Sequence, residues 1–290
     1  VYFGQDGGNM PRLKRYLADV QQGMTPTTIW KYEEVGHNQE GRQEVKKLFE
    51  NKGYFDGPKP LRLMDRILTI ANLSDNDIVL DFFSGSATTA HAVMQMCSEK
   101  SMHLKYILVQ LPEKIDESSD AYADGYSTLC DIGKERIRRA GKKIKEDSPI
   151  TTQHLDIGFR VFKLDDTNMT DVYYSADEYN QSMLSMLASN VKSDRTDLDL
   201  LFGCLLEWGL PISLPYTSEK IEGYTVHTYN DGDLIACFDE AIPDSVIKEI
   251  ARRQPLRAVF RDSSFAGSPA KINVGEIFKM LAPDTRVKVI

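Results

Sequence analysis

The chain has 290 residues, of which 41% are hydrophobic and 27% are charged, and its net charge at pH 7 is −8. This composition indicates a folded globular protein and excludes collagen-like, disordered and membrane-spanning classes, because no apolar run approaches the roughly 20 residues that cross a bilayer. The length exceeds that of one ordinary domain, so two compact units are expected. No secretory pattern is present, which predicts a cytoplasmic protein.

The charge is unevenly distributed along the chain. Residues 1–147 contain 21 Lys and Arg against 22 Asp and Glu, whereas residues 148–290 contain 14 against 21. The acidity therefore belongs to the second half. The total charge is a poor guide to partners here, because the nearly neutral first half remains compatible with nucleic acid.

Hydrophobic periodicity and turn residues predict the elements of the first half. Helices are expected at residues 11–23, 39–50, 61–71, 87–96 and 127–145. Short apolar strands are expected at residues 1–3, 78–82 and 106–109. One helix and a polar connection separate the last two strands, which is the spacing of a right-handed β-α-β crossover, so a parallel sheet is predicted.

The pattern changes beyond Pro149, and a boundary is expected near residues 148–157. Strands are predicted at residues 158–164, 212–214, 224–228, 234–238, 256–260 and 286–290. Helices are predicted at residues 176–188, 198–208, 245–252 and 272–281. No internal repeat occurs, which excludes solenoids and propellers.

The most informative stretch joins the strand at 78–82 to the helix at 87–96 and reads Asp81-Phe82-Phe83-Ser84-Gly85-Ser86-Ala87-Thr88-Thr89. A strand that ends in an acidic residue, followed by a small-residue loop and a helix, presents a carboxylate and backbone N–H groups at the carboxyl end of a parallel sheet. This geometry favours a nucleotide or cofactor. A purely structural β-α turn shows the same pattern, so both interpretations stay open.

Other cofactor and metal sites are excluded by what the sequence lacks. A P-loop needs Gly-Lys-Ser/Thr, and no Lys follows Gly85; a dinucleotide fingerprint needs three glycines, and only Gly85 is present. The cysteines form no Cys-x-x-Cys pair, so buried thiols are expected and no metal site is assigned. These cysteines are Cys97, Cys130, Cys204 and Cys237.

The stretch from Asp81 to Thr89 resembles the S-adenosylmethionine-binding motif of amino-group DNA methyltransferases, Asp-x-Phe-x-Gly-Ser-Gly-Thr-Thr, with Ala87 in place of the usual glycine. Further segments resemble, in the right order, the modification (Mod) subunit of type III restriction–modification systems, an adenine-N6 DNA methyltransferase of the permuted (beta) class. These segments are residues 34–40, 58–60, 109–113, 135–141, 159–164, 260–265 and 288–290. Essentially the whole chain is covered.

The resemblance implies an α/β fold: a partial Rossmann-like S-adenosylmethionine-dependent methyltransferase domain with a parallel sheet, followed by a smaller α+β domain. It divides the chain into residues 1–57, the end of a target-recognition region with connecting helices; 58–150, the cofactor-binding half; and 151–290, a carboxyl-terminal assembly domain. It also implies three partners and no membrane. The partners are DNA for the full-length protein, a second Mod subunit and the restriction (Res) subunit.

The resemblance also implies a set of cofactor-binding residues. The methionine and ribose parts of the cofactor are surrounded by Asp81, Phe83, Gly85, Ser86 and Thr88, and Lys59 and Pro60 flank the same pocket. Strand two of the family usually ends in a carboxylate for the ribose hydroxyls. Gln110 stands at that position, so either its neutral amide or Glu113 is expected to make this contact.

Methyl transfer to an adenine amino nitrogen requires a flipped base, an aromatic stacking face and acceptors that orient the amino group. The family uses an Asp-Pro-Pro-Tyr motif, which does not occur in residues 1–290. Asp171-Val172-Tyr173-Tyr174 lacks both prolines and follows the cofactor motif, so it is interpreted as structural. No catalytic residue is assigned, and we expect an inactive carboxyl-terminal fragment of a longer Mod subunit.

Two other functions remain open. One is a noncatalytic assembly module, which the departures at Ala87 and Gln110 favour. The other is an N4-cytosine methyltransferase, which shares the cofactor loop but lacks the later type III segments. His91 is interpreted as structural, because transfer to an amino nitrogen needs no strong base there.

A cationic tract in the helix at 127–145 has two interpretations. Its seven cations are Lys134, Arg136, Arg138, Arg139, Lys142, Lys143 and Lys145. They form either a phosphate-contacting face or a solvated helix flank. The apolar positions Ile137, Ala140 and Ile144 favour the flank, because they turn another face of the helix inward.

Overall fold

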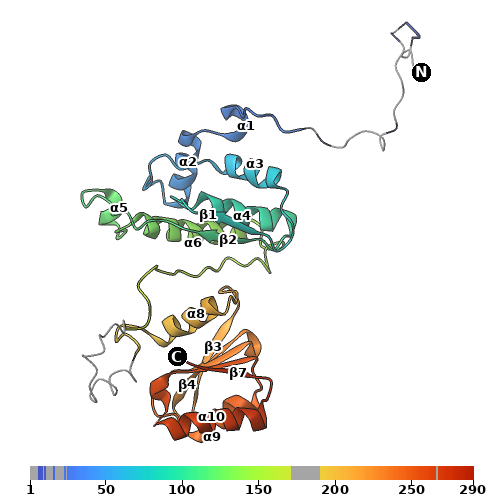
Figure 1. Ribbon diagram of the computed structural model, residues 1–290. Helices are drawn as coiled ribbons and strands as arrows, with labels where there is room; N and C mark the ends of the chain where they lie inside the picture. Colours follow the sequence, from blue (N-terminus) through green and yellow to red (C-terminus); the bar gives the residue numbers. More distant parts are fainter. Residues whose placement is uncertain are drawn as a thin grey trace, which may run out of the picture. The chain divides into compact units, whose positions relative to one another are not determined.

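The computed structural model describes residues 6–8, 10, 16, 23, 25–170, 190–265 and 267–290. The chain divides into two compact units, Val1–Phe159 and Arg160–Ile290 (Figure 1). The segments expected at residues 1–3, 11–23, 171–174 and 176–188 lie almost entirely outside the described residues. Within the described ranges, none of the helices has the length and apolar character needed to cross a membrane.

The first unit is built on a two-stranded parallel sheet, as the β-α-β spacing predicts. Strand β1 (Ile78–Asp81) pairs in parallel with strand β2 (Lys105–Leu108). The helices of this unit are α1 (Tyr32–Val35), α2 (Asn38–Leu48), α3 (Leu61–Ala71), α4 (Thr88–Lys100), α5 (Asp120–Ala123) and α6 (Leu129–Asp147). The predicted α/β fold class is confirmed.

One face of this sheet is buried against helix α4. Val79 of β1 packs in a cluster with Val93, and Leu108, which ends β2, packs in a cluster with Met94. Helices α3 and α6 both contact α4. Helix α4 is therefore enclosed by the sheet and by two helices, which explains why apolar residues surround it instead of forming one stripe.

The other face of the sheet is not covered by any described residue. Five apolar side chains on it are half or more exposed, and we call them the open apolar face: Ile78, Leu80, Ile107, Val109 and Leu111. Parallel sheets normally bury both faces, because their strands carry apolar residues on each side. The first unit thus leaves apolar surface of the kind that a further layer of structure ordinarily covers.

The second unit is a five-stranded mixed sheet in the order β3-β4-β5-β6-β7. Its strands are β3 (Tyr216–Ile221), β4 (Tyr224–Tyr229), β5 (Leu234–Cys237), β6 (Arg257–Phe260) and β7 (Arg286–Val289). Its helices are α8 (Asp197–Glu207), α9 (Asp244–Arg252) and α10 (Ser268–Leu281), with 3₁₀ turns η3 (Asn230–Gly232) and η4 (Asp262–Ser264). Pairing is antiparallel from β3 to β5 and parallel from β5 to β7.

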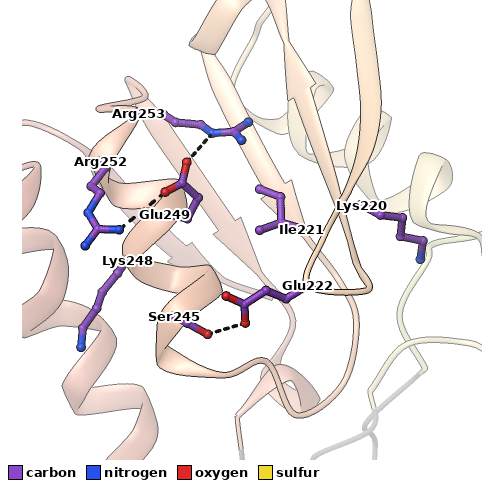
Figure 2. Close-up of a pocket in the computed structure, with 8 residues that line it drawn as sticks. All are labelled: Lys220, Ile221, Glu222, Ser245, Lys248, Glu249, Arg252 and Arg253. Atoms are coloured by element: carbon purple, nitrogen blue, oxygen red, sulfur yellow. Dashed lines mark hydrogen bonds and ion pairs between the residues drawn. The ribbon is translucent and has the colours of Figure 1, made fainter.

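The β3–β4 hairpin is fastened to helix α9 by polar contacts (Figure 2). The Ser245 hydroxyl donates to the Glu222 carboxylate over 2.6 Å. Arg253, which directly follows α9, forms an ion pair with Glu219 on β3. These contacts fix the otherwise polar edge strand β3 beside the helix.

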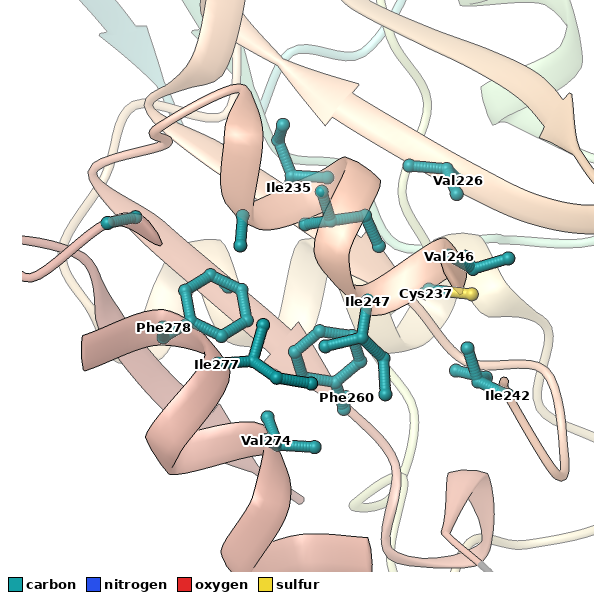
Figure 3. Close-up of a cluster of buried hydrophobic side chains, with 14 of the residues drawn as sticks. Val226, Ile235, Cys237, Ile242, Val246, Ile247, Phe260, Val274, Ile277 and Phe278 are labelled. Carbon is teal, nitrogen blue, oxygen red and sulfur yellow. The ribbon is translucent and has the colours of Figure 1, made fainter. Parts of the chain in front are cut away.

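Two apolar cores lie on opposite faces of the second sheet. Phe260 packs with Phe278 of α10 and Ile247 of α9 in one of them (Figure 3). Its sequence neighbour Val259 packs with Leu201 of α8 in the other. Alternate residues of a strand point to opposite faces, so both cores come from the same central strands. This unit is a three-layer structure with α8 on one face and α9 and α10 on the other.

Two predicted strands of the second unit do not form. Residues 158–164 run as extended chain without a strand partner among the described residues, and the Arg160 guanidinium instead donates to the carbonyl oxygen of Leu214 over 2.7 Å. Residues 212–214 form a bend, because Pro211 and Pro215 flank them and provide no amide hydrogens for a ladder.

Among the described strands, β3 is the one that sequence patterns missed. Its four central residues are polar and exposed, so it has no apolar alternation to reveal it. It forms because β4 beside it is well buried and offers a complete edge for pairing. Tertiary context therefore determines this strand.

The open apolar face predicts self-association of the isolated chain. Leu80 and Ile107 are neighbours across the strand pair, and the double substitution Leu80→Lys/Ile107→Lys places charge at the centre of that face. We expect the unaltered chain to associate with rising concentration and the double variant to stay monomeric, as measured by sedimentation velocity. The pair Leu164→Lys/Leu206→Lys alters exposed leucines of the second unit and serves as control. A monomeric unaltered chain at all concentrations would contradict the prediction.

Candidate functional site

The loop that joins β1 to α4, residues 82–87, continues the hydrogen bonding of the sheet. The Val109 amide donates to the Asp81 carbonyl over 2.9 Å, and the Ser84 amide donates to the Val109 carbonyl over 3.2 Å. The Ala87 amide then closes the turn on the Ser84 carbonyl at 2.7 Å. This β1–α4 loop is therefore placed at the carboxyl edge of the parallel strands, as expected for a ligand-binding loop.

Two residues of the loop have left-handed backbone. Gly85 has φ of +50° and Ala87 has φ of +60°. Glycine adopts this conformation freely, whereas an alanine side chain costs roughly 1–2 kcal/mol there. The glycine usual in the resembled motif suits position 87 for this reason, and Ala87 keeps the same backbone under strain.

Asp81 holds the end of β1 to the start of α4. One carboxylate oxygen accepts a hydrogen bond from the Phe83 amide at 3.2 Å, and the other accepts from the Thr89 hydroxyl. The predicted ligand residue therefore also organises the loop. Phe83 itself is 76% exposed, so its ring is available to a ligand.

Gln110 follows β2 and is bound directly to the loop. Its side-chain oxygen accepts from the Gly85 amide at 2.7 Å, and its side-chain nitrogen donates to the Leu111 carbonyl at 3.3 Å. Glu113 is exposed, and its backbone carbonyl accepts from the Leu129 amide at 3.0 Å. The structure thus brings Asp81, Gly85 and Gln110 together, while the Glu113 carboxylate stays at the surface.

The turn at Pro58-Lys59-Pro60 is held by helix α2. The Leu61 amide donates to the Glu44 carboxylate at 3.0 Å, and a Cβ on Gly41 would stand 2.3 Å from the Pro58 carbonyl oxygen. Both prolines are buried and Lys59 is exposed. Among the described residues, no hydrogen bond joins Lys59 to the β1–α4 loop.

Phe55 is a neighbour of the loop that sequence reasoning missed. Its ring comes within 3.2 Å of the point that a Cβ on Gly85 would occupy. Any side chain at position 85 would therefore meet this ring, in addition to the strain of its positive φ. The only indication in the sequence is that Phe55 lies three residues before the Pro58-Lys59-Pro60 turn, which is too little to place its ring at the loop.

Ser86 and Thr88 are buried and face helix α6. Their hydroxyl oxygens both accept from Nη1 of Arg136, each at 2.7 Å. Arg136 is itself fully buried, so both interpretations of the cationic tract are wrong for this residue. The physical reason is its helical position, because it lies on the same inward face as Ile132 and Ala140.

The other cations of the tract mostly pair with acidic residues of their own helix. Arg139 binds Glu135 at 2.8 Å, and Lys143 lies 3.3 Å from Asp147. Further pairs join Lys134 to Asp131, Arg138 to Glu135 and Lys142 to Glu146. Pairing of this kind is typical of a solvated helix flank, which was the favoured interpretation.

A groove of about 310 Å³ lies between α2, α4 and α6, away from the β1–α4 loop. Its buried residue is His91, whose Nδ1 has no hydrogen-bond partner among the described residues. Burial, with smaller contributions from Arg136 and Lys143, lowers the pKa of His91 from its usual 6.5 to about 3. His91 is therefore neutral at physiological pH, in agreement with its structural interpretation.

A second hollow, of about 640 Å³, lies on the second unit beside α9 (Figure 2). Glu249 stands between two arginines there, 3.6 Å from Arg252 and 3.7 Å from Arg253. Cations and acidic groups thus offset each other around it. None of the residues expected to bind cofactor lines this hollow.

The first unit now has the features of one class of protein. A carboxylate ends β1, a left-handed glycine follows it, and the amino end of α4 opens beside an exposed aromatic ring. Residues 7–142 match the DNA methylase family. The match covers most of the first unit.

Similar proteins indicate a narrower class than the family model does. It is 36% identical over 59% of its length to the StyLTI Mod subunit of Salmonella typhimurium, 31% over 78% to the EcoP15I Mod subunit of Escherichia coli, and 29% over 78% to the EcoPI Mod subunit of Escherichia phage P1. All three are subunits of type III restriction–modification enzymes. The chain is similar to these Mod subunits over more than half of its length, and it spans 26%, 32% and 34% of their respective lengths.

The buried His91 predicts a specific pH dependence of stability. Its folded-state pKa lies below its unfolded value, so the unfolded chain binds the extra proton between pH 6.5 and about 3. The free energy of unfolding is therefore highest above pH 6.5, where His91 is neutral in both states, and it decreases as the pH falls. Urea unfolding between pH 6 and 4 should show the unaltered protein losing about 1 kcal/mol more per pH unit than His91→Leu.

The control for this measurement is His154→Leu, which removes an exposed histidine of the same unit. It should leave the pH dependence of the unaltered protein unchanged. Parallel stability curves for His91→Leu and the unaltered protein would show that His91 is accessible to protons in the folded state.

Proposed function

We propose that the first unit binds S-adenosylmethionine at the β1–α4 loop. The observation that carries the proposal is the hydrogen-bonded junction of Asp81, Gly85 and Gln110 at the carboxyl edge of the parallel strands, within a DNA methylase domain. The binding residues are those of the resembled motif. They are Asp81, Phe83, Gly85, Ser86, Thr88, Lys59, Pro60, Gln110 and Glu113.

The residues present fit this cofactor. The amino end of α4 supplies backbone N–H groups without intrahelical acceptors, which suits a carboxylate. The exposed Phe83 ring offers an apolar surface for the adenosine part. Lys59, which the resemblance places beside the same pocket, is exposed. Bound S-adenosylmethionine would supply an activated methyl group on its sulfonium sulfur.

The reaction we propose for the whole protein is methylation of the N6 amino group of adenine in DNA, on a base flipped from the duplex. Residues 1–290 contain no Asp-Pro-Pro-Tyr motif to stack the base and accept its amino hydrogens. The contribution of this chain is therefore cofactor binding, and by itself it transfers no methyl group.

The second unit is proposed to serve assembly. Residues 148–290 hold 14 Lys and Arg against 21 Asp and Glu, a balance that repels phosphates and favours protein partners. The relatives are named as subunits of larger enzymes. We propose a second Mod subunit and the Res subunit as its partners, and DNA as the partner of the whole protein.

One observation supports an alternative function, a noncatalytic assembly module. Both oxygens of the Asp81 carboxylate and the side-chain oxygen of Gln110 are engaged inside the loop. A fold kept only as a scaffold would show the same internal bonding. Cofactor titration separates the two functions, because a scaffold alone gives no binding.

The first prediction is that the chain binds S-adenosylmethionine in calorimetric titration. Phe83→Ala should weaken binding by about tenfold, equivalent to about 1.4 kcal/mol, because an exposed ring that covers the adenosine is removed. Its melting temperature should stay unchanged, since the side chain is exposed. Phe162→Ala, which alters a half-exposed ring of the second unit, should bind like the unaltered chain. Absence of binding by the unaltered chain would favour the scaffold.

The second prediction concerns activity. With a radiolabelled methyl donor and adenine-containing duplex DNA, the chain alone should transfer no label above the level of a heat-denatured sample. The reason is the missing base-orienting motif, which removes positioning that contributes several orders of magnitude in rate. Measurable transfer would show that a base-orienting group exists elsewhere in these residues.

A further inference from the structure

Arg136 is a fully buried cation without an acidic partner. It is 0% exposed, and its Nε and Nη2 have no hydrogen-bond partner among the described residues. Burial lowers the pKa of Arg136 to about 10, and Glu44 opposes this shift only at longer range. A buried and unpaired charge is costly, so its presence calls for a compensating role.

Glu44 does not supply this compensation. It is half-buried, and desolvation raises the pKa of its carboxyl group. Its oxygens accept from the Leu61 amide, at the start of α3. In the described part of the chain, no carboxylate lies within ion-pair distance of the Arg136 guanidinium.

The surroundings of Arg136 concentrate positive potential at the β1–α4 loop. Its Nη1 donates to the hydroxyls of Ser86 and Thr88, both at the start of α4. The amino end of a helix is already the positive end of its dipole. A cation placed there raises the energy of the empty site, and an anion bound at the same place lowers it.

The hydrogen bonding of the two hydroxyls has a further consequence. Ser86 Oγ and Thr88 Oγ1 each accept from the guanidinium, and they lie 3.3 Å from each other. At most one of the two hydroxyl hydrogens can serve the other oxygen, so at least one remains to be donated elsewhere. Arg136 therefore prepares the loop to face an acceptor.

We propose that Arg136 is a positioning residue for the amino-acid end of the bound cofactor, and that its charge stabilises the carboxylate of that ligand at the amino end of α4. This rests on the proposed function. S-adenosylmethionine has one negative group, the α-carboxylate, beside a positive ammonium and a positive sulfonium. The positive end of the site therefore takes the carboxylate, and Arg136 acts through Ser86 and Thr88 and through its field.

The packing of α6 supports this assignment. Gly133, one turn before Arg136, lies beside the loop: the point that a Cβ there would occupy is 3.4 Å from the Gly85 carbonyl oxygen, which is van der Waals contact. Arg139, on the next turn, donates to the Leu48 carbonyl at 3.0 Å. Helix α6 is thus seated against the loop on one side and α2 on the other, which fixes where the guanidinium lies.

The test compares two ligands that differ in the amino-acid end, which carries the carboxylate. S-adenosylhomocysteine contains the amino-acid end, whereas 5′-methylthioadenosine lacks it, and affinities of the full chain are measured by calorimetry. Arg136→Met should weaken the binding of S-adenosylhomocysteine by about tenfold or more and the binding of 5′-methylthioadenosine by less than about twofold. Arg136→Lys keeps the charge, so the ratio of the two affinities should stay within about twofold of the unaltered chain.

The control is Arg138→Met on the same helix, whose side chain is 58% exposed; it should change neither affinity. If Arg136 only held the loop in place, Arg136→Met would weaken the binding of both ligands equally and leave the ratio of their affinities unchanged. That outcome would overturn this inference without affecting the proposed function. Absence of binding by the unaltered chain would remove the proposed function and the inference with it. If Arg136→Met does not fold, Arg136→Lys is the deciding variant. A tenfold change in its ratio of the two affinities would overturn the claim that the charge of residue 136 stabilises the carboxylate.

Discussion

The hydrogen bonds of the Asp81 carboxylate are the interaction on which the functional geometry of the first unit depends. They tie the end of β1 to the Phe83 amide and to Thr89 on α4, so strand, loop and helix form one rigid junction. Gln110 adds the second strand to the same junction through the Gly85 amide. A site built this way needs little reorganisation on binding, because its backbone is held before any ligand arrives.

The same unit combines a well-ordered junction with two uncompensated features. One is the open apolar face on β1 and β2, and the other is the buried charge of Arg136. Each is unfavourable for the unit taken by itself, and each is removed by a different kind of contact. Apolar cover would bury the face, whereas an anion in the β1–α4 loop would offset the charge.

Local patterns in the sequence predicted the elements that local physics determines. Helices α3, α4 and α6, the parallel pair and the loop from Asp81 to Thr89 follow from periodicity, spacing and small residues. Strand β3 and the irregular course of residues 158–164 depend on which neighbours are available for pairing, and no local pattern contains that information.

The candidate site divides in the same way. The motif residues are consecutive in the chain and could be found, whereas Phe55 and Arg136 reach the loop from elsewhere. Arg136 was obscured by its surroundings, because six further cations in the same tract suggested a solvated face. The helical phase places it with the buried Ile132 and Ala140. Lys143, seven residues further on, has nearly the same phase but is exposed, so phase alone does not identify Arg136.

The burial of Ser86 and Thr88 changes how the motif can act. Ser86 is 3% and Thr88 5% exposed, so a hydroxyl there offers a ligand little beyond its one remaining hydrogen. Its influence passes through orientation and charge, because it is fixed by a guanidinium and lies at the positive end of a helix. Direct contact then falls to exposed groups such as Phe83 and to the backbone N–H groups of the loop. Small polar residues in such a motif can therefore serve the ligand by transmitting the field of a residue 50 positions away in the sequence.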